Sequence, residues 1–259
     1  MKKTVFFIVT FCLLLCICSC NKDKNKKHTY EILKDVVTDI DGNHYDAVKI
    51  GDQIWMMQNL KTTRYADGTE IPLSMESTVY EGFNWPSDGP YRWAPNDDTL
   101  NIGKFGWLYN WQALIRSGSG SDRNPSGVQG ICPDGWHVPS DAEWTELTDY
   151  VSSDRKMRSY NSDDAIAKAL AAQTDWEPGS DKGDVGYDLS KNNATGFSAL
   201  PAGIAGYPFV TFGNSGYYWT ATYAGYDRAY CRSFHSGNED VNKDSWLTEN
   251  GLSVRCVKD

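Results

Sequence analysis

The chain has 259 residues, enough for one large domain with a substantial hydrophobic core. Its formal net charge of −9 argues against nucleic acid and anionic lipid surfaces as partners, since both require a positively charged contact surface. The 15 tyrosines, 10 tryptophans and 23 glycines favour an extracytoplasmic domain rich in loops and turns.

The first residues have the pattern of an export signal. Two lysines precede an apolar run from Val5 to Ile17, which is shorter than the about 20 residues of a transmembrane helix. The small residue Ser19 precedes Cys20 at the end of this run, so the segment resembles a bacterial lipoprotein box. We expect residues 1–19 to be a lipoprotein signal peptide and Cys20 to be lipidated. An ordinary secretory peptide or an uncleaved anchor is the alternative.

The next segment is polar and rich in lysine, and we assign residues 20–37 to the lipidated cysteine and a solvated tether. Removal of residues 1–19 takes away two lysines and lowers the formal charge from −9 to −11. We therefore expect an outer-membrane lipoprotein of the cell envelope, attached to the membrane by lipid alone. Periplasmic and surface-exposed positions both remain open.

Short strands are predicted at the start of the domain, which we place at residues 38–259. A strand in Val36–Tyr45 leads into a turn at Gly42. Ala47–Ile50 and Gln53–Met56 follow as strands with a second turn between them.

The middle of the chain predicts loops and helices. Gly68–Lys104 is loop-rich, Trp107–Ile115 suggests a short aromatic helix, and Ser117–Ser126 is a polar loop. A second helix is expected over Asp163–Gln173, followed by a long loop over 175–194.

Residues 131–147 contain the strongest local signal. Pro133–Gly135 has turn chemistry, and Ser140 with Glu143 three residues later has the form of a capping box. Trp144 and Leu147 then begin an apolar face that Val151 continues at helical spacing. We predict a helix from residue 141 onwards.

The remainder of the chain predicts short strands. Helices in the middle and strands at both ends indicate an α+β fold with two main helices, long loops, and paired N- and C-terminal strands. The predicted C-terminal strands are Gly196–Leu200, Tyr217–Thr222, Ala229–His235 and Leu252–Val257.

Three cysteines lie outside the signal segment, and outside the cytoplasm two of them are expected to pair. We favour Cys132–Cys256, which would join the helix entry to the last strand and leave Cys231 as a buried thiol. A Cys231–Cys256 bond is the alternative. There is no CxxC pair and no Cys/His cluster at zinc spacing, so we expect no structural zinc.

Eight short blocks recur in the same order in a known family. The chain over residues 38–259 resembles the Fibrobacter succinogenes major paralogous domain family, which consists largely of exported lipoproteins of Bacteroidetes and Fibrobacteres. The resemblance implies a C-type-lectin-like fold of short twisted antiparallel sheets; attachment to polysaccharide is a recurrent suggestion for the family. The blocks are Asp39–Asn43, Val48–Gly51, Trp55–Leu60, Leu108–Trp111, Cys132–Ser140, Gly196–Gly203, Tyr218–Thr222 and Ser253–Lys258.

No catalytic, metal-binding or cofactor-binding residues are expected. The Glu-Pro-Asn, Gln-Pro-Asp and Trp-Asn-Asp motifs of calcium-dependent lectins do not occur. Formylglycine-generating enzymes, which share the fold group, bind copper through two closely spaced cysteines, whereas Cys231 and Cys256 are far apart in sequence. The acidic stretch 238–244 has oxygen ligands for a hard cation, but we expect it to be solvated. His137 is interpreted as a packed, hydrogen-bonded residue.

The segment 207–246 is the best candidate for a binding surface, because aromatic rings stack on sugars and also dominate adaptable protein-binding loops. Trp219 and Tyr217 lie two residues apart on one strand face, and both are expected in the core. The candidate ligand-binding residues are Tyr207, Tyr223, Tyr226, Asp227, Tyr230, Arg232, His235, Asn238, Asp240, Asn242 and Trp246.

The sequence therefore predicts a lipid-anchored binding module of the cell envelope, which recognises a surface glycan or a protein without catalysis. A structural or adhesin-type subunit is the alternative. The Asn- and Tyr-rich residues 214–250 also resemble the variable patches that retroelements diversify. An enzyme of the formylglycine-generating type is the third hypothesis.

Overall fold

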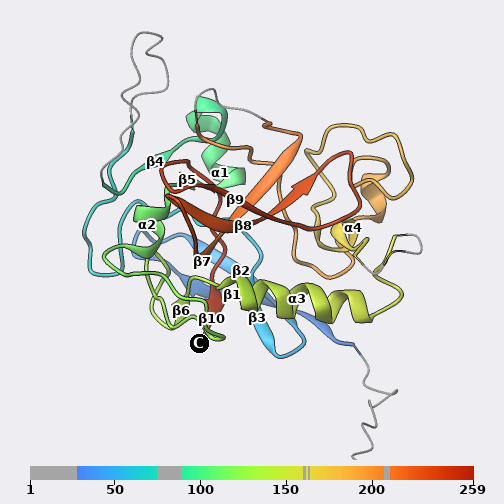
Figure 1. Cartoon of the computed structure of the whole chain (residues 1–259), viewed down its shortest axis with the longest axis horizontal. Coiled ribbons are helices and arrows are strands. Elements are labelled where there is room, and N and C mark those ends of the chain that lie inside the picture. The colour runs from blue at the N-terminus through green and yellow to red at the C-terminus, as the bar shows by residue number, and fades with distance from the viewer. Residues whose placement is uncertain (1–27, 75–88, 160–161, 163, 207–210) are drawn as a thin grey trace, which may run out of the picture.

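Three antiparallel sheets and one long helix make up the α+β fold of the computed structural model (Figure 1). The structure describes residues 28–74, 89–159, 162, 164–206 and 211–259. The predicted signal peptide, the lipidation site Cys20 and the candidate Tyr207 lie outside these residues. Within the described ranges, no helix has both the length and the apolar character needed to cross a membrane.

The first sheet joins the two ends of the domain, as predicted. Its strand order is β1-β2-β3-β10-β6, so the last strand of the chain lies between two much earlier ones. Val257 is the partner of both Trp55 and His137. The strands are β1 (Tyr30–Thr38), β2 (His44–Ile50), β3 (Gln53–Met56), β6 (Trp136–His137) and β10 (Val257–Lys258).

β1 corrects the predicted domain boundary, because residues 30–37 were assigned to the tether. Tyr30 and Leu33 pack against the core, while most other side chains of this edge strand face solvent and give it a polar sequence. The register with β2 shifts between Leu33 and Val37, where the Asp35 N–H and the Lys34 ammonium both bond to the Asp46 carboxylate, at 2.9 and 2.8 Å. The folded part of the chain thus includes all of β1.

Two smaller sheets follow. β4 (Arg92–Trp93) pairs with β5 (Leu108–Tyr109). β7 (Ser215–Gly225), β8 (Arg228–His235) and β9 (Asn242–Leu247) form a three-stranded sheet in that order. β7 is longer than predicted, and β9 was not predicted at all.

Several predicted strands are much reduced. Gly196–Leu200 contributes only an isolated bridge between Ala171 and Ala199, and in 252–257 only Leu252 and Ser253 form isolated bridges before β10 begins at Val257. The short helical segments between the sheets are η1 (Pro95–Asp97), η2 (Thr99–Asn101), α1 (Ile102–Phe105), α2 (Trp111–Ile115) and η3 (Leu189–Lys191).

The main helix, α3 (Asp141–Ser153), begins with the predicted capping box. The Ser140 hydroxyl accepts the N–H of Glu143, and the Glu143 carboxylate accepts the N–H of Ser140 at 2.9 Å. The three apolar residues of the predicted face are fully buried. The helix therefore starts where local sequence dictates and packs through the expected side.

The second predicted helix is wrong in length: among the described residues of Asp163–Gln173, only α4 (Ala167–Leu170), in the middle of this range, is helical. Ala171 leaves the helix in an extended conformation and bridges to Ala199, and the N–H of Ala172 donates to the Ala199 carbonyl at 2.7 Å. Backbone pairing with a distant segment thus outweighs the helix propensity of an alanine-rich run.

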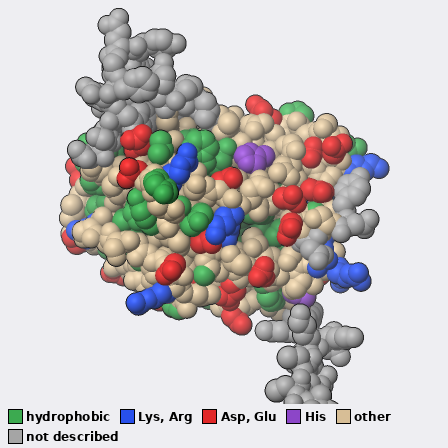
Figure 2. Space-filling model, in the orientation of Figure 1, with side chains coloured by type: hydrophobic (Ala, Val, Ile, Leu, Met, Phe, Trp, Pro, Cys, Tyr) green, Lys and Arg blue, Asp and Glu red, His purple; other side chains and the backbone are tan. Residues whose placement is uncertain are grey.

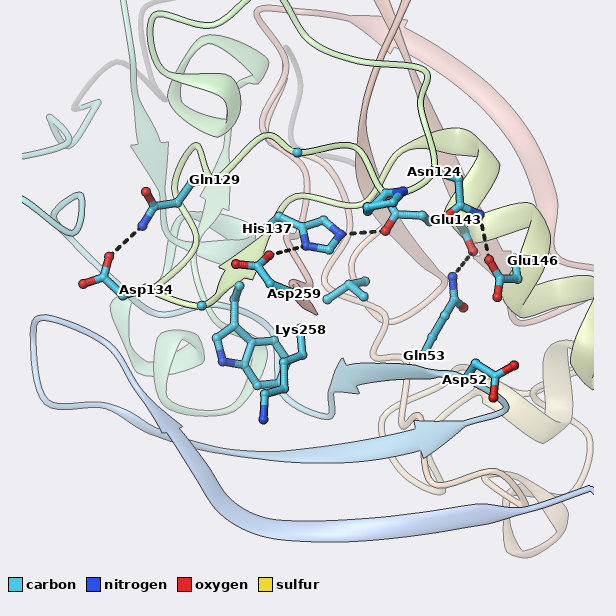
Figure 3. A pocket seen from close by; sticks show the side chains of 15 residues that line it. Asp52, Gln53, Asn124, Gln129, Asp134, His137, Glu143, Glu146, Lys258 and Asp259 are labelled. Carbon is cyan, nitrogen blue, oxygen red and sulfur yellow. Dashed lines mark hydrogen bonds and ion pairs between the residues drawn. The ribbon is translucent and has the colours of Figure 1, made fainter.

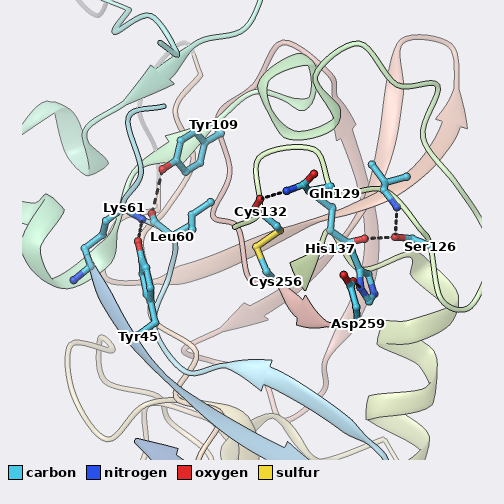
Figure 4. The surroundings of a disulfide bond; sticks show 12 residues. Tyr45, Leu60, Lys61, Tyr109, Ser126, Gln129, Cys132, His137, Cys256 and Asp259 are labelled. Atoms are coloured by element: carbon cyan, nitrogen blue, oxygen red, sulfur yellow. Dashed lines mark hydrogen bonds and ion pairs between the residues drawn. A yellow bond between two sulfur atoms is a disulfide. The ribbon is translucent and has the colours of Figure 1, made fainter. Parts of the chain in front are cut away.

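The predicted disulfide Cys132–Cys256 is present and spans a sequence separation of 124 residues (Figure 4). It joins the turn before β6 to the residue just before β10, so the disulfide lies next to the pair β6 and β10 and helps to hold these strands together. Cys231 is a buried thiol, as expected. Burial raises the pKa of this thiol well above its ordinary value.

A buried arginine connects the sheets to the loops around them. Arg255 lies over the rings of Phe197 and Tyr218, at 4.7 and 5.4 Å from their centroids. Its guanidinium donates to the Asn59 side-chain oxygen at 2.9 Å and to the Ser198 carbonyl at 2.7 Å, among other carbonyls. One side-chain oxygen and several backbone carbonyls thereby satisfy a fully buried charge, and these bonds fix the path of the loops that supply the carbonyls.

Candidate functional site

The tip of the β7–β8 hairpin carries the most exposed aromatic side chain of the described chain. Gly225 pairs with Arg228, so Tyr226 and Asp227 form a two-residue turn. Both have positive φ, 52° and 56°, as a type I′ turn requires. Asn and Gly favour this conformation, whereas other residues occupy it at a cost. A tyrosine that is 97% exposed therefore occupies a backbone position poorly suited to it.

The tip is held in place from several sides. The Asp227 N–H donates to the Tyr223 hydroxyl at 2.9 Å, and the Thr248 N–H donates to the Asp227 carbonyl at 2.8 Å. The Tyr223 ring packs against Trp111, with centroids 5.6 Å apart, and Tyr223 remains 47% exposed. Hydrogen bonds thus hold the turn on two sides, and Tyr226 and the neighbouring Tyr223 are exposed to solvent on a fixed backbone.

Trp246 on β9 extends the aromatic surface. It is half-buried, and its ring meets the edge of Tyr217 at a centroid distance of 5.7 Å. Tyr217 and Trp219 are buried, as the sequence predicted. On the face drawn in Figure 2, hydrophobic side chains gather between the positions of β4 and β9, and acidic side chains lie toward α4.

Strand alternation divides the predicted binding residues between two faces of the sheet. Asn242 pairs with Ser233, so it lies on the same face as His235 and Trp246. Tyr230 lies on the opposite face, where the Lys243 ammonium sits 4.0 Å from its ring centroid. These candidates therefore do not form one continuous surface.

Arg232 is not part of a ligand surface, which corrects the prediction. Its side chain is buried, and its guanidinium donates to the Thr145 hydroxyl at 2.8 Å and pairs with the Asp141 carboxylate at 2.9 Å. Arg232 thus joins β8 to the start of α3. Arg232 and Tyr230 alternate on the strand, and the sequence alone does not indicate which of the two side chains is covered.

Asn238 and Asp240 lie at the other end of the sheet, in the connection between β8 and β9. The Asn238 side chain accepts the Asp240 N–H at 3.1 Å, and its carbonyl accepts the Val185 N–H at 3.1 Å. These contacts hold the connection against the loop 181–186. The structure thus groups Tyr223, Tyr226 and Asp227 at the tip and leaves these two residues far along the sheet.

Serine, histidine and aspartate side chains meet on the sheet, but not in the order of a hydrolase triad. The Ser233 hydroxyl donates to the Asp244 carboxylate, while His235 Nε2 lies 3.1 Å from the same hydroxyl. His235 Nδ1 faces the Ser215 hydroxyl at 2.8 Å instead of a carboxylate. Burial lowers the pKa of His235 despite the opposing effect of Asp244. The serine is buried and already bonded, so it has no exposed nucleophilic position.

A depression of about 620 Å³ opens beside His137, and its lining is drawn in Figure 3. His137 Nε2 is 2.6 Å from Glu143 Oε1, and Nδ1 is 2.7 Å from the Asp259 carboxylate. Burial lowers the pKa of His137, but the hydrogen bonds and charges of the two carboxylates outweigh it, so the pKa is raised.

Both carboxylate oxygens of Glu143 also have hydrogen-bond partners. Oε1 contacts His137, and Oε2 accepts the N–H groups of Ser126 and Ser140, at 3.0 and 2.9 Å. Neither side chain is left as a free base, and the arrangement serves to hold α3 against β6 and the last residue. His137 is hydrogen-bonded, as expected from the sequence, but its two carboxylate partners were not predicted. The signal was available in Glu143, whose carboxylate the capping box turns back toward the residues before the helix.

No group of three or more His, Cys, Asp or Glu side chains in the described ranges has an arrangement that could hold a metal ion. The candidate site of the described chain is therefore the hairpin tip with Tyr223, Tyr226 and Asp227, extended by Trp246.

Comparison with known proteins gives one match. A family model described as the Fibrobacter succinogenes major domain matches residues 48–258. The matched stretch begins inside β2 and includes α3, both disulfide cysteines and the β7–β8 hairpin, whereas the block Asp39–Asn43 lies before it. Neither the curated proteins nor the solved structures contain a match to the chain.

Proposed function

The chain belongs to the Fibrobacter succinogenes major domain family, and from this premise we propose that it is a non-catalytic binding module of the cell envelope. In this proposal the fold is C-type-lectin-like, and the ligand is a surface glycan or a protein. Contact is made by the hairpin tip around Tyr226 and by Trp246. The module is held to the outer membrane by a lipid on Cys20, after removal of residues 1–19.

The main support for a binding role is Tyr226. Its ring is almost wholly exposed, its backbone is in the left-handed region, and its turn is tied down by Tyr223 and Thr248. A residue held in an unfavourable conformation at an exposed position suggests a function that compensates for the strain. Tyrosines on a fixed support lose little conformational entropy on binding, which suits them as contact residues.

The absence of catalysis in this proposal is supported by the contacts of the buried His137 and the half-buried His235. Both nitrogens of His137 face carboxylates, and Ser233, the serine beside Nε2 of His235, donates to Asp244. General base catalysis needs a nitrogen or oxygen that reaches a substrate proton. The ring nitrogens of His137 and His235 are all within hydrogen-bond distance of other side chains of the fold.

A structural or adhesin-type subunit is the second candidate, favoured by the position of β9. This strand lies at the edge of its sheet in the described chain, and an edge strand can pair with a strand of another protein. Lys243 and Asp244 place charges on it, which opposes indiscriminate pairing.

The proposal is tested by measuring binding of the purified full chain to an array of immobilised polysaccharides and to purified envelope proteins. Tyr226→Asn removes the ring but suits the turn, so the variant should fold. Affinity should fall at least about tenfold, as expected for a central aromatic contact. Leu100→Ala is the matched control, because Leu100 is 87% exposed and lies away from the hairpin on η2.

Two results would contradict the proposal. The first is a ligand that binds the wild-type chain and Tyr226→Asn equally well. The second is the lack of binding to every glycan and protein presented. Competition by free oligosaccharide separates the glycan ligand from the protein ligand.

A further inference from the structure

A second depression, of about 320 Å³, lies beyond the C-terminal end of α3, beside α4 and η3. It is separate from the hairpin tip and from the His137 depression. Its lining is unusual for an acidic chain, because it contains five cationic residues and one acidic residue. The cationic residues are Lys156, Arg158, Lys168, Lys182 and Lys191, and the acidic one is Asp188.

The single carboxylate of this pocket already has a structural role. Asp188 caps η3, and its Oδ1 accepts the Ser190 hydroxyl at 2.7 Å and the Ser190 N–H at 3.2 Å. The hydrogen bond from the Ser190 hydroxyl is the main cause that lowers the pKa of Asp188; the Ser190 N–H and the charges of Lys191 and Lys168 add to it, and burial opposes it. One carboxylate beside four lysines leaves the pocket with a local positive charge, in a chain whose net charge is −9.

Lys168 is the most constrained of the cations. Its side chain is only 7% exposed, and its ammonium donates to the backbone carbonyls of Asp184 and Asp188, at 2.8 and 3.3 Å. An ammonium group has three donors, and these two bonds use carbonyl oxygens instead of a counter-ion. A buried charge without a paired charge is costly, and an anion entering the pocket would relieve that cost.

The remaining lysines of the pocket are exposed. In the described chain, the ammonium groups of Lys156, Lys182 and Lys191 take part in no hydrogen bond or ion pair, although acidic residues gather nearby. Burial raises the pKa of Glu239, and the nearby charges of Asp240, Asp184 and Asp181 raise it further. Acidic side chains therefore gather beside the 181–186 loop, which also supplies Lys182 to the pocket.

One wall of the pocket is aromatic. Tyr187 is 49% exposed and lines the pocket, and Met157 adds a further apolar surface. The N–H of Tyr187 donates to the Asp184 carbonyl at 3.2 Å, which fixes the backbone at Tyr187. The same carbonyl accepts a hydrogen bond from the Lys168 ammonium. An aromatic face beside cations suits a ligand that combines a ring with an anionic group.

We propose that this pocket binds an acidic monosaccharide unit, with its carboxylate or sulfate beside Lys168 and the flanking lysines and its ring against Tyr187. The volume is near the lower end for ligand pockets, which favours one sugar unit. The negative charge of the whole chain repels anionic membranes and long polyanions. At physiological salt this repulsion is screened within about 8 Å, so a small ion that enters the pocket meets mainly the local positive charge. The inference does not depend on the role of the hairpin tip.

The probe for this site is D-glucuronate, with D-glucose as its neutral counterpart. Saturation-transfer difference NMR on the purified full chain should detect glucuronate and not glucose, and inorganic sulfate should compete. Added salt should weaken binding. Lys182→Gln with Lys191→Gln should lower the affinity at least about tenfold, since two exposed cations are removed without touching the core. Tyr187→Ala should abolish saturation transfer to the sugar ring protons while sulfate still competes for the residual binding.

Lys258→Gln is the matched control, because Lys258 is an exposed cation outside this pocket. It should bind glucuronate as the wild-type chain does. The proposal fails if glucuronate does not bind, if glucose binds equally well, or if the double lysine variant behaves like Lys258→Gln. Binding to phosphatidylglycerol vesicles without binding to glucuronate would replace the sugar with a lipid headgroup and would also overturn it. Near-UV circular dichroism confirms that each variant is folded.

Discussion

At the scale of single residues, the buried His137 and the half-buried His235 illustrate how burial and charge compete in setting a pKa. His137 has carboxylates at both nitrogens and its pKa is raised, whereas His235 has a hydroxyl at each nitrogen and its pKa is lowered. The two residues therefore affect stability in opposite directions as pH changes.

The first prediction concerns the pH dependence of stability. The pKa of His137 in the folded chain lies above its unfolded value of about 6.5. Its contribution is fully present below about pH 6.5 and is lost as pH rises through the higher folded value. Replacing His137 by Gln should therefore reduce the loss of unfolding free energy between pH 6 and pH 8, measured by urea denaturation.

His44→Gln is the control for the loss of one imidazole elsewhere in the chain, because His44 is exposed and lies on the edge strand pair. His235 affects stability in the opposite direction, because its pKa is lowered in the folded chain. Its contribution to the free energy of unfolding is present above about pH 6.5 and is lost as pH falls through the lower folded value. A His137→Gln variant whose pH dependence equals that of the wild-type chain would show that the two carboxylates do not stabilise the imidazolium.

At the scale of elements, the hairpin turn between β7 and β8 has a sequence that does not suit its conformation. Type I′ turns favour Asn-Gly, and this one is Tyr226-Asp227. By contrast, α3 begins with a capping box that satisfies its first N–H groups. Local sequence and local structure therefore agree where the chain builds its scaffold and disagree at the proposed contact surface.

The second prediction follows from this disagreement. Replacing Tyr226-Asp227 by Asn-Gly should raise the free energy of unfolding by about 1 kcal/mol, because both residues then accept positive φ readily. Urea denaturation measures the change. Tyr187→Asn makes a similar change at an exposed tyrosine without positive φ, and it should alter stability by less than about 0.5 kcal/mol. A turn variant that is no more stable than the wild-type chain would mean that Tyr226 is unstrained.

Elements with a local signal could be predicted from the sequence, and those that depend on distant partners could not. The start of α3 and the turns at Gly42 and Gly51 follow from a few neighbouring residues. β9 was missed because Asn242–Leu247 has no apolar alternation; it is a strand because β8 offers it partners. α4 was overestimated because pairing of Ala171 with Ala199 is invisible locally.

The candidate site was predicted in part for the same reason. Exposure of Tyr223, Tyr226 and Asp227 followed from their place in a turn between strands. The burial of Arg232 required knowing that Asp141 at the start of α3 faces β8. The cationic pocket could not be foreseen, since its lysines come from three segments that only the fold brings together.

At the scale of the whole molecule, the disulfide joins the middle of the chain to its last strand. Cys132 and Cys256 are separated by 124 residues, and closing so long a loop restricts the unfolded chain strongly. The bond lies where β6 and β10 meet, so it reinforces a contact between segments that share no local sequence.

The third prediction concerns this bond. Replacing Cys132 and Cys256 together by Ala should lower the free energy of unfolding by about 2–5 kcal/mol, chiefly because the unfolded chain gains freedom. Urea denaturation with and without reductant provides the internal control. Reductant should destabilise the wild-type chain and leave the double variant unchanged, since the remaining Cys231 is a buried thiol. Equal sensitivity of the two proteins to reductant would contradict the role of this bond.

The place of β10 in the first sheet also constrains the order of events during synthesis. Its partners β3 and β6 are complete long before Val257 leaves the ribosome, yet no other described strand lies between them. Until then the sheet remains in two parts, and a growing chain cannot finish it by adding strands in turn. Such high contact order slows folding and leaves strand edges open for a longer time. The first sheet to be translated is therefore among the last parts of the protein to become complete.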